Sequence, residues 1–165
     1  MKTAIVFYSF SGNTQRAAEF LRKRIGGETK LLRVKPQQET TSFLQQGFIA
    51  AARKKIELES IECDLKDYDF VVFAAPVWAF TVAPALRSYL DAAVGLEGKK
   101  TACFLTCGSD NLSASALKEV EELLRAKNAH ILFSRNLVDR MTEKEDYLDE
   151  KFKPLLDMIA SSAGK

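Results

Sequence analysis

The residues best suited to chemistry form one short turn, SFSGNT, between an apolar run and an amphipathic stretch. Its hydroxyl and amide side chains can donate hydrogen bonds, and its glycine lets the backbone bend closely around a ligand. A turn that opens a helix also offers unpaired backbone N–H groups and the positive end of the helix dipole. This combination predicts an anion site, and a phosphate monoester fits it well. The alternative is a plain polar turn with a capping hydroxyl.

Two other phosphate-binding patterns do not match this turn. A Walker turn would have more residues between its glycines and a lysine after them, and a dinucleotide-binding turn would show GxGxxG. The sequence has neither pattern here, which disfavours triphosphate and dinucleotide ligands. The turn also contains no cation, so we expect neutral donors alone to hold the phosphate.

Two further segments follow later apolar runs of the chain. In APVWAF, the only tryptophan and a phenylalanine follow such a run, where an indole would be partly exposed unless a flat aromatic ligand covered it. The alternative is a tryptophan folded down onto the core. In LTCGSDN, a glycine-containing turn offers backbone groups to the polar edge of such a ligand. This last segment is weak evidence by itself, and a plain loop is the alternative.

The elements that must position these segments alternate along the chain. The pattern predicts strands at 3–9, 30–35, 70–75, 101–106 and 130–138, with amphipathic helices between most of them. This alternation is typical of an α/β protein with a doubly wound parallel sheet and helices on both faces. We expect five strands in the order 2-1-3-4-5, one of two common solutions. In either, the ligand binds at the carboxyl ends of the strands, where the winding reverses.

Local signals refine these boundaries. Pro76 is expected to end the third strand, because proline cannot donate to a strand ladder. The segment 36–68 forms a long connection in which Ser42 can cap a helix. Thr142 and Glu145 have the spacing of a capping box at the start of the last helix.

The chain as a whole suits a single domain of residues 1–165, with 36–68 as an elongated connection between the second and third strands. Its composition is that of a soluble globular protein, and a net charge of +2 argues against nucleic acid as a partner. No apolar run approaches the roughly 20 residues needed to cross a bilayer. The short apolar run at the N-terminus predicts a strand rather than a signal peptide, so we expect a cytoplasmic protein.

The cysteines and the single histidine indicate no metal site. Cys63, Cys103 and Cys107 lack the spacing of a zinc site or a redox CxxC pair, and we expect them to be core thiols in a reducing compartment. His130, the only histidine, opens a predicted strand and argues against chemistry that needs a nucleophile–histidine dyad.

The segments SFSGNT, PVW and TCGS at the switch point of one sheet resemble the flavodoxin family, from Lys2 to about Ile159. The resemblance implies bound FMN, with the first segment on its phosphate, the second beside its isoalloxazine ring and the third on the pyrimidine side. The cofactor-binding residues it implies are Ser9, Phe10, Ser11, Gly12, Asn13 and Thr14, then Pro76, Val77, Trp78, Ala79 and Phe80, then Thr106, Cys107, Gly108 and Ser109.

The sequence departs from the one-electron carriers of that family in two ways. TCGSDN lacks the aromatic residue that commonly stacks on the outer face of the flavin. PVWAFTVAP lacks the glycine whose peptide flips to accept the N5–H of the reduced flavin, so a flip here would meet a Cβ penalty. We therefore expect the one-electron-reduced flavin to be less stabilised than in those carriers.

The main expectation is an FMN-binding flavodoxin-like protein that transfers electrons between redox partners, either proteins or small molecules. The two departures favour an alternative, an NAD(P)H-dependent FMN quinone reductase. A third alternative, of another class, is a non-redox binding module with the same fold and no flavin. A phosphoryl-accepting receiver domain is discarded, since it needs acidic residues where this chain has Tyr8 and Ser9. We assign no catalytic side chain.

Overall fold

The computed structural model describes residues 1–38, 54–109 and 113–163. Five parallel strands lie side by side in the order β2 (Glu28–Arg33), β1 (Lys2–Phe7), β3 (Phe70–Trp78), β5 (Lys100–Cys107) and β6 (His130–Val138). A sixth, very short strand, β4 (Thr81–Val82), pairs antiparallel with the end of β3. Counted along the chain without β4, the order is 2-1-3-4-5, which confirms the prediction.

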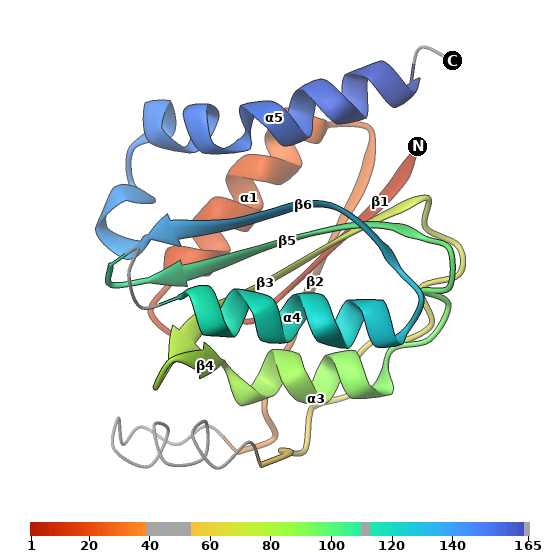
Figure 1. Ribbon diagram of the computed structural model, residues 1–165, viewed down its shortest axis with the longest axis vertical. Helices are drawn as coiled ribbons and strands as arrows, with labels where there is room; N and C mark the ends of the chain where they lie inside the picture. The colour runs from red at the N-terminus through yellow and green to blue at the C-terminus, as the bar shows by residue number, and fades with distance from the viewer. Residues whose placement is uncertain (39–53, 110–112, 164–165) are drawn as a thin grey trace.

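Helices cover both faces of this sheet (Figure 1). On one face lie α1 (Asn13–Ile25) and α5 (Glu145–Ala163), and on the other lie α3 (Pro84–Ala92) and α4 (Ala114–Ala126). An apolar core fills the space between the sheet and each helical layer. The first six residues of β3 are all buried, because a central strand with helices on both sides has no solvent-facing side chain. The fold is therefore the predicted doubly wound α/β sandwich.

The structure corrects the expected end of the third strand. β3 does not stop at Pro76 but continues to Trp78. Pro76 has no N–H, yet its carbonyl oxygen accepts a hydrogen bond from the Ala83 N–H at 3.1 Å. The two residues after it pair with β4, so the strand continues as one arm of a hairpin.

The expected capping box at the last helix is also wrong. Residues Asp139–Met141 form a short 3₁₀ helix, and the Thr142 hydroxyl donates to the Asp139 carbonyl oxygen at 2.8 Å. The Thr142 hydroxyl therefore bonds to the 3₁₀ helix and does not cap α5, which begins only at Glu145. The helix expected from Ser42 lies outside the described residues.

Candidate functional site

The three sequence segments meet at one edge of the sheet. β1, β3 and β5 are neighbours, and each segment begins within three residues of the carboxyl end of its strand, on the left in Figure 1. The hydroxyls of Thr14 and Thr106 lie 2.8 Å apart and join the first segment to the third. The rings of Phe10 and Trp78 pack edge to face with their centroids 5.9 Å apart and join the first to the second. The topology thus brings together residues almost a hundred positions apart.

The first turn has the features of an anion site. Ser9 is 3% exposed, and its hydroxyl has no hydrogen-bond partner among the described residues. Gly12 has a φ of 92°, in the left-handed region that favours glycine, and its carbonyl oxygen accepts the first helical hydrogen bond from the Arg16 N–H. No side chain caps α1 and no acidic residue lies in its first turn, so its N–H groups remain available to a ligand. An orphaned buried hydroxyl beside free N–H groups fits a phosphate.

A cation lies close behind this turn. Arg16 donates from Nη1 to Asn13 Oδ1 and to Thr142 Oγ1, both at 3.1 Å. Asn13 in turn donates from Nδ2 to Ser11 Oγ at 3.2 Å. The sequence led us to expect neutral donors alone, because Arg16 stands two residues beyond the motif. In the structure its guanidinium reaches the turn through Asn13, while its Nη2 also pairs with the exposed Glu143 at 3.6 Å.

The second segment is a hairpin rather than a loop. Val77 pairs with Val82 and Trp78 with Thr81, which leaves Ala79 and Phe80 as a two-residue turn. Their φ angles are 46° and 63°, so both residues are left-handed, as a type I′ turn requires. Such turns favour glycine or asparagine, and this one has neither, which is why the sequence pattern did not reveal it.

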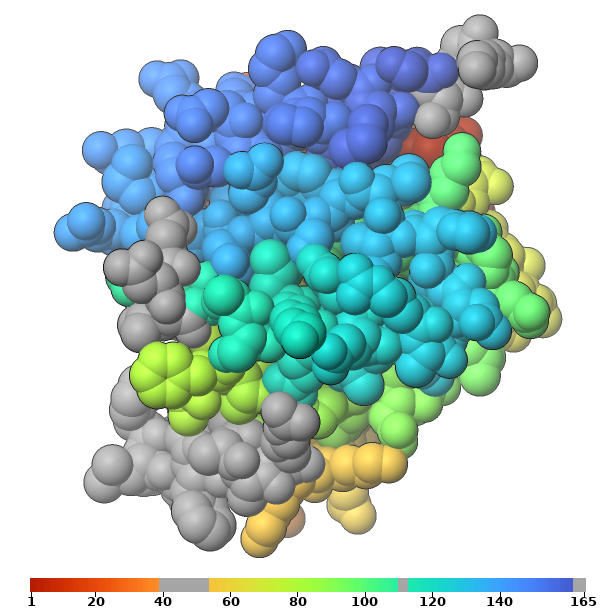
Figure 2. Space-filling model, viewed as in Figure 1, coloured from red at the N-terminus to blue at the C-terminus, as the bar shows by residue number. Residues whose placement is uncertain are grey.

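Aromatic rings gather around this hairpin. Trp78 is half-buried, and Tyr8 packs edge to face against it with a centroid distance of 5.6 Å. Phe10 and Phe80 are 42% and 63% exposed, which is unusual for large apolar side chains. Figure 2 shows the hairpin residues as a yellow-green patch at the left edge of the surface. The exposed apolar area therefore lies beside the first turn, to which Phe10 belongs.

The third segment is fixed by hydrogen bonds from its buried cysteine. Thr106 and Cys107 are buried, whereas Gly108 and Ser109 are exposed. The Cys107 thiol donates to the Ser109 carbonyl oxygen at 3.0 Å and to the Leu137 carbonyl oxygen at 3.7 Å. Backbone groups at Gly108 and Ser109 are thus presented at the edge of the sheet. The three residues that follow lie outside the described part of the chain.

Sequence reasoning missed Asp139. This residue directly follows β6, and the side chains of Thr106 and Asn13 hydrogen-bond to its carboxylate. Burial raises its pKa, and the two hydrogen bonds, which act to lower the pKa, do not cancel that effect. An acidic residue immediately after a predicted strand was the available signal, because the carboxyl ends of parallel strands share one edge.

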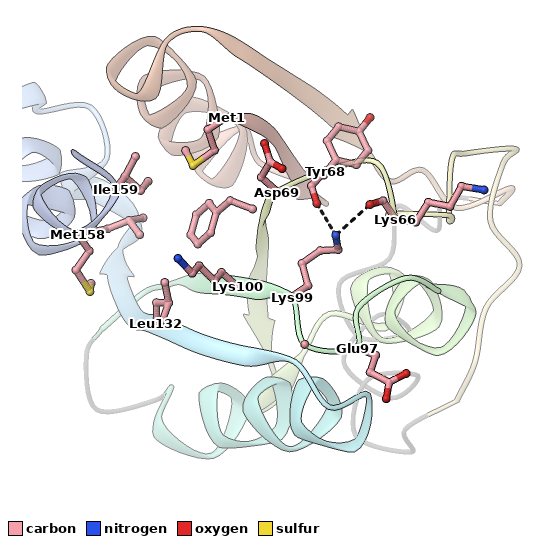
Figure 3. A pocket seen from close by; sticks show the side chains of 13 residues that line it. Met1, Lys66, Tyr68, Asp69, Glu97, Lys99, Lys100, Leu132, Met158 and Ile159 are labelled. Atoms are coloured by element: carbon pink, nitrogen blue, oxygen red, sulfur yellow. Dashed lines mark hydrogen bonds between the residues drawn. The ribbon is translucent and has the colours of Figure 1, made fainter. Parts of the chain in front are cut away.

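A cavity of about 530 Å³ lies at the opposite edge of the sheet (Figure 3). It is lined by residues that lead into β3 and β5 and by the last turns of α5. One of its cations, Lys99, already donates from Nζ to the carbonyl oxygens of Lys66 and Tyr68. The cavity is therefore far from the three segments and is separate from the predicted site.

Neither a metal site nor a membrane span is evident in the ranges that the structure describes. No group of three or more histidine, cysteine or acidic side chains there is arranged to hold a metal ion. No helix in the same ranges has the length and apolarity needed to cross a membrane.

The fold and the three segments define a flavodoxin-like flavoprotein. The chain belongs to the NADPH-dependent FMN reductase family, whose model matches residues 1–143. Membership in that family makes FMN the cofactor and redox chemistry the function. No protein with a curated description matches the sequence.

Solved structures share the fold at low sequence identity. A flavoprotein from Bacteroides uniformis is 21% identical with a TM-score of 0.71, covering 91% of this chain and 98% of its own. Oxidised flavodoxin 2 from Bacillus cereus is 19% identical with a TM-score of 0.68, covering 98% and 99%. A Lactobacillus acidophilus flavoprotein, solved with FMN, is 22% identical with a TM-score of 0.65, covering 88% and 98%. At these identities the likeness concerns the fold.

Proposed function

We propose that this protein is an FMN-dependent oxidoreductase that takes electrons from NADPH and passes them to a quinone or a similar acceptor. The FMN would lie across the three segments at the carboxyl edge of the sheet. When bound, FMN supplies the redox chemistry, because it accepts electrons in pairs or singly. The protein would bind the cofactor, orient its ring and limit the redox states that the flavin can reach.

One observation carries the placement of the cofactor: the buried, unpartnered hydroxyl of Ser9 beside the open N-terminus of α1. A buried hydroxyl without a partner costs roughly 1–3 kcal/mol. A phosphate oxygen would satisfy it and would also accept N–H groups from the turn that Gly12 shapes. Arg16, acting through Asn13, would add positive charge behind the phosphate.

The ring of FMN would lie against the aromatic hairpin. Trp78 is held edge-on by Tyr8 and Phe10, which fixes the plane of its indole. Phe80 would be covered in part by the bound ring, which explains its exposure without a ligand. The backbone at Gly108 and Ser109 would meet the polar edge of the ring.

The conformation of the hairpin turn supports two-electron chemistry. Rotating the peptide between Ala79 and Phe80 would convert a type I′ turn into a type II′ turn, whose first position requires glycine. Ala79 occupies that position, so its Cβ opposes the rotation. A carrier that moves single electrons benefits from such a rotation, as the sequence comparison with flavodoxins implies. Hydride transfer from NADPH has no need of it.

The proposal is tested by mixing the FMN-loaded protein with NADPH without oxygen and following the visible absorbance of the flavin. We expect NADPH to bleach the flavin, and reoxidation to follow addition of a quinone. Failure of NADPH and NADH to reduce a flavin that dithionite does reduce would contradict the proposal.

An electron carrier between protein partners is the second candidate. The structural likeness to flavodoxin 2 of Bacillus cereus favours it, although that likeness concerns the fold. The same experiment separates the two candidates, because a carrier would be reduced by a partner protein and not directly by NADPH.

A further inference from the structure

A buried ion pair lies directly behind the β3–β4 hairpin. Arg87 of α3 donates from Nε to Glu119 Oε1 of α4 at 2.7 Å, and each side chain is only 10% exposed. Replacing such a pair by apolar residues of similar size often leaves a protein as stable or more stable. Stability is therefore a weak explanation for two charges at this place.

Both partners bond to the same short strand. Glu119 Oε2 accepts hydrogen bonds from the Thr81 hydroxyl and from the Val82 N–H, the latter at 3.3 Å. Arg87 donates from Nη2 to Thr81 Oγ1 at 2.6 Å and to the Val82 carbonyl oxygen at 3.2 Å. Because Thr81 and Val82 are the whole of β4, the pair holds that strand from both helices.

The turn that precedes β4 needs such support. Two consecutive left-handed residues with side chains are unfavourable and persist only where the surroundings hold them. Pairing with β4 fixes the far side of this turn, and the Ser115 hydroxyl donates to the Phe80 carbonyl oxygen at 2.5 Å. Ser115 and Glu119 lie one turn apart on α4. One helix face thus supports both the turn and the strand.

We propose that Arg87 and Glu119 are a positioning pair for the flavin ring. By holding β4 they keep the Ala79–Phe80 turn left-handed and fix the Trp78 indole beside the place where the ring would lie. The effect on the ring rests on the proposed function, whereas the effect on the hairpin does not. Neither residue belongs to the implied cofactor contacts, so both act through the hairpin.

Four variants separate positioning from stability. Glu119→Gln removes one charge and leaves Arg87 buried and uncompensated. The double variant Arg87→Met with Glu119→Met removes both charges, so that stability can recover while the bonds to β4 stay lost. Thr81→Val leaves the ion pair intact and removes the hydroxyl that bonds to both of its members, while the bonds to the Val82 backbone remain. Glu122→Gln makes the same substitution as the first variant at an exposed site on the same helix and serves as the control.

The readouts are thermal unfolding, acrylamide quenching of tryptophan fluorescence and affinity for FMN and riboflavin. Trp78 is the only tryptophan, so its quenching reports the hairpin in the protein without flavin. We expect stronger quenching in all but the control. We also expect both flavins to bind roughly tenfold more weakly, since an aromatic contact contributes about 0.5–1.5 kcal/mol. The ratio of the two affinities should not change, because none of the variants alters the turn from Ser9 to Thr14, which would hold the phosphate.

Two outcomes would overturn the proposal. In the first, the double variant unfolds at the wild-type temperature and also shows wild-type quenching and wild-type affinities. The pair would then only stabilise the fold. Should that variant not fold, wild-type quenching in both Glu119→Gln and Thr81→Val would lead to the same conclusion. Failure of the wild-type protein to bind either flavin would instead refute the proposed function, and the quenching data would still decide whether the pair positions the hairpin.

Discussion

Two polar groups, the buried Ser9 and the half-buried Asp139, dominate the candidate site at the scale of single residues. The Ser9 hydroxyl has no partner among the described residues, so folding has cost the free energy of its hydrogen bonds to water. A ligand that makes one hydrogen bond with this hydroxyl recovers part of that free energy. The Asp139 carboxylate has partners but carries a charge next to the turn from Ser9 to Thr14. The first group favours an anionic ligand and the second opposes it.

Asp139→Asn tests the second group. Burial raises the pKa of Asp139 above its ordinary value of 3.8, so the ionised form is disfavoured in the folded protein, and stability is lost as pH rises through the raised pKa. The amide keeps the acceptor for Thr106 and removes the charge. We expect FMN to bind roughly fivefold more tightly at neutral pH, an effect of the order of 1 kcal/mol. Flavin fluorescence titration measures it, and unchanged or weaker binding would show that the carboxylate does not face the phosphate.

At the scale of elements, the hairpin after β3 is the feature with the most strain. Two left-handed residues with side chains each cost about 1–2 kcal/mol relative to the right-handed conformation. The turn is nevertheless fixed by its pairing with β4 and by α4. Strain that the surroundings maintain at a candidate site is expected to serve the chemistry of that site.

Ala79→Gly tests that expectation. Glycine relieves strain in the first position of the turn and permits the type II′ conformation, so the protein should be more stable by up to about 1 kcal/mol. During anaerobic reduction of bound FMN by dithionite, we expect the long-wavelength absorbance of one-electron-reduced flavin to appear in this variant.

Phe80→Gly is the matched control for Ala79→Gly. It relieves similar strain but leaves the Ala79 Cβ in place, so the peptide remains unable to rotate. A long-wavelength band of equal strength in the wild-type protein and in both variants would show that the turn does not limit the redox states of the flavin.

The sequence predicted most elements because their signals are local. Continuous apolar runs mark β3 and β5, and amphipathic stripes mark the helices between the strands. The β3–β4 hairpin escaped prediction because its strand of two residues has no periodicity and its turn has no glycine. The capping box failed because Thr142 is used by a neighbouring 3₁₀ helix, a competition that spacing alone does not reveal.

At the scale of the whole molecule, the topology assembles the site. The sequence could predict that segments after β1, β3 and β5 meet, since these strands are neighbours in the expected order. It could not predict contacts between side chains of distant segments, such as Arg16 with Thr142, 126 positions apart, or Asp139 with Thr106. Such contacts depend on loop conformations that no periodicity encodes.

The buried Arg87–Glu119 pair is expected to make the stability of the whole fold depend on pH in the acid range. Burial acts to raise the pKa of Glu119, but hydrogen bonds from Arg87 and Thr81 outweigh it, and the pKa lies below its ordinary value of 4.5. The stability it contributes is therefore present above that value and is lost as pH falls through the lowered pKa. We expect the unfolding temperature to fall below about pH 4.5 in the wild-type protein and to change less in Glu119→Gln. Glu122→Gln again serves as the control. If the unfolding temperature depends on pH in the same way in the wild-type protein and in Glu119→Gln, the pair does not contribute this acid sensitivity.

The most direct measurement compares the affinities for FMN and for riboflavin, two flavins that differ only in the phosphate. Fluorescence titration gives both affinities for the wild-type protein, for Ser9→Ala and for Ser60→Ala, a control at an exposed serine. Ser9 has no partner to lose, so its replacement should not destabilise the protein without flavin. If the turn from Ser9 to Thr14 holds the phosphate, FMN binds more tightly than riboflavin, and Ser9→Ala weakens FMN alone by roughly tenfold, or about 1.4 kcal/mol. Equal affinities of the wild-type protein for the two flavins, or an FMN affinity unaffected by Ser9→Ala, would place the phosphate elsewhere.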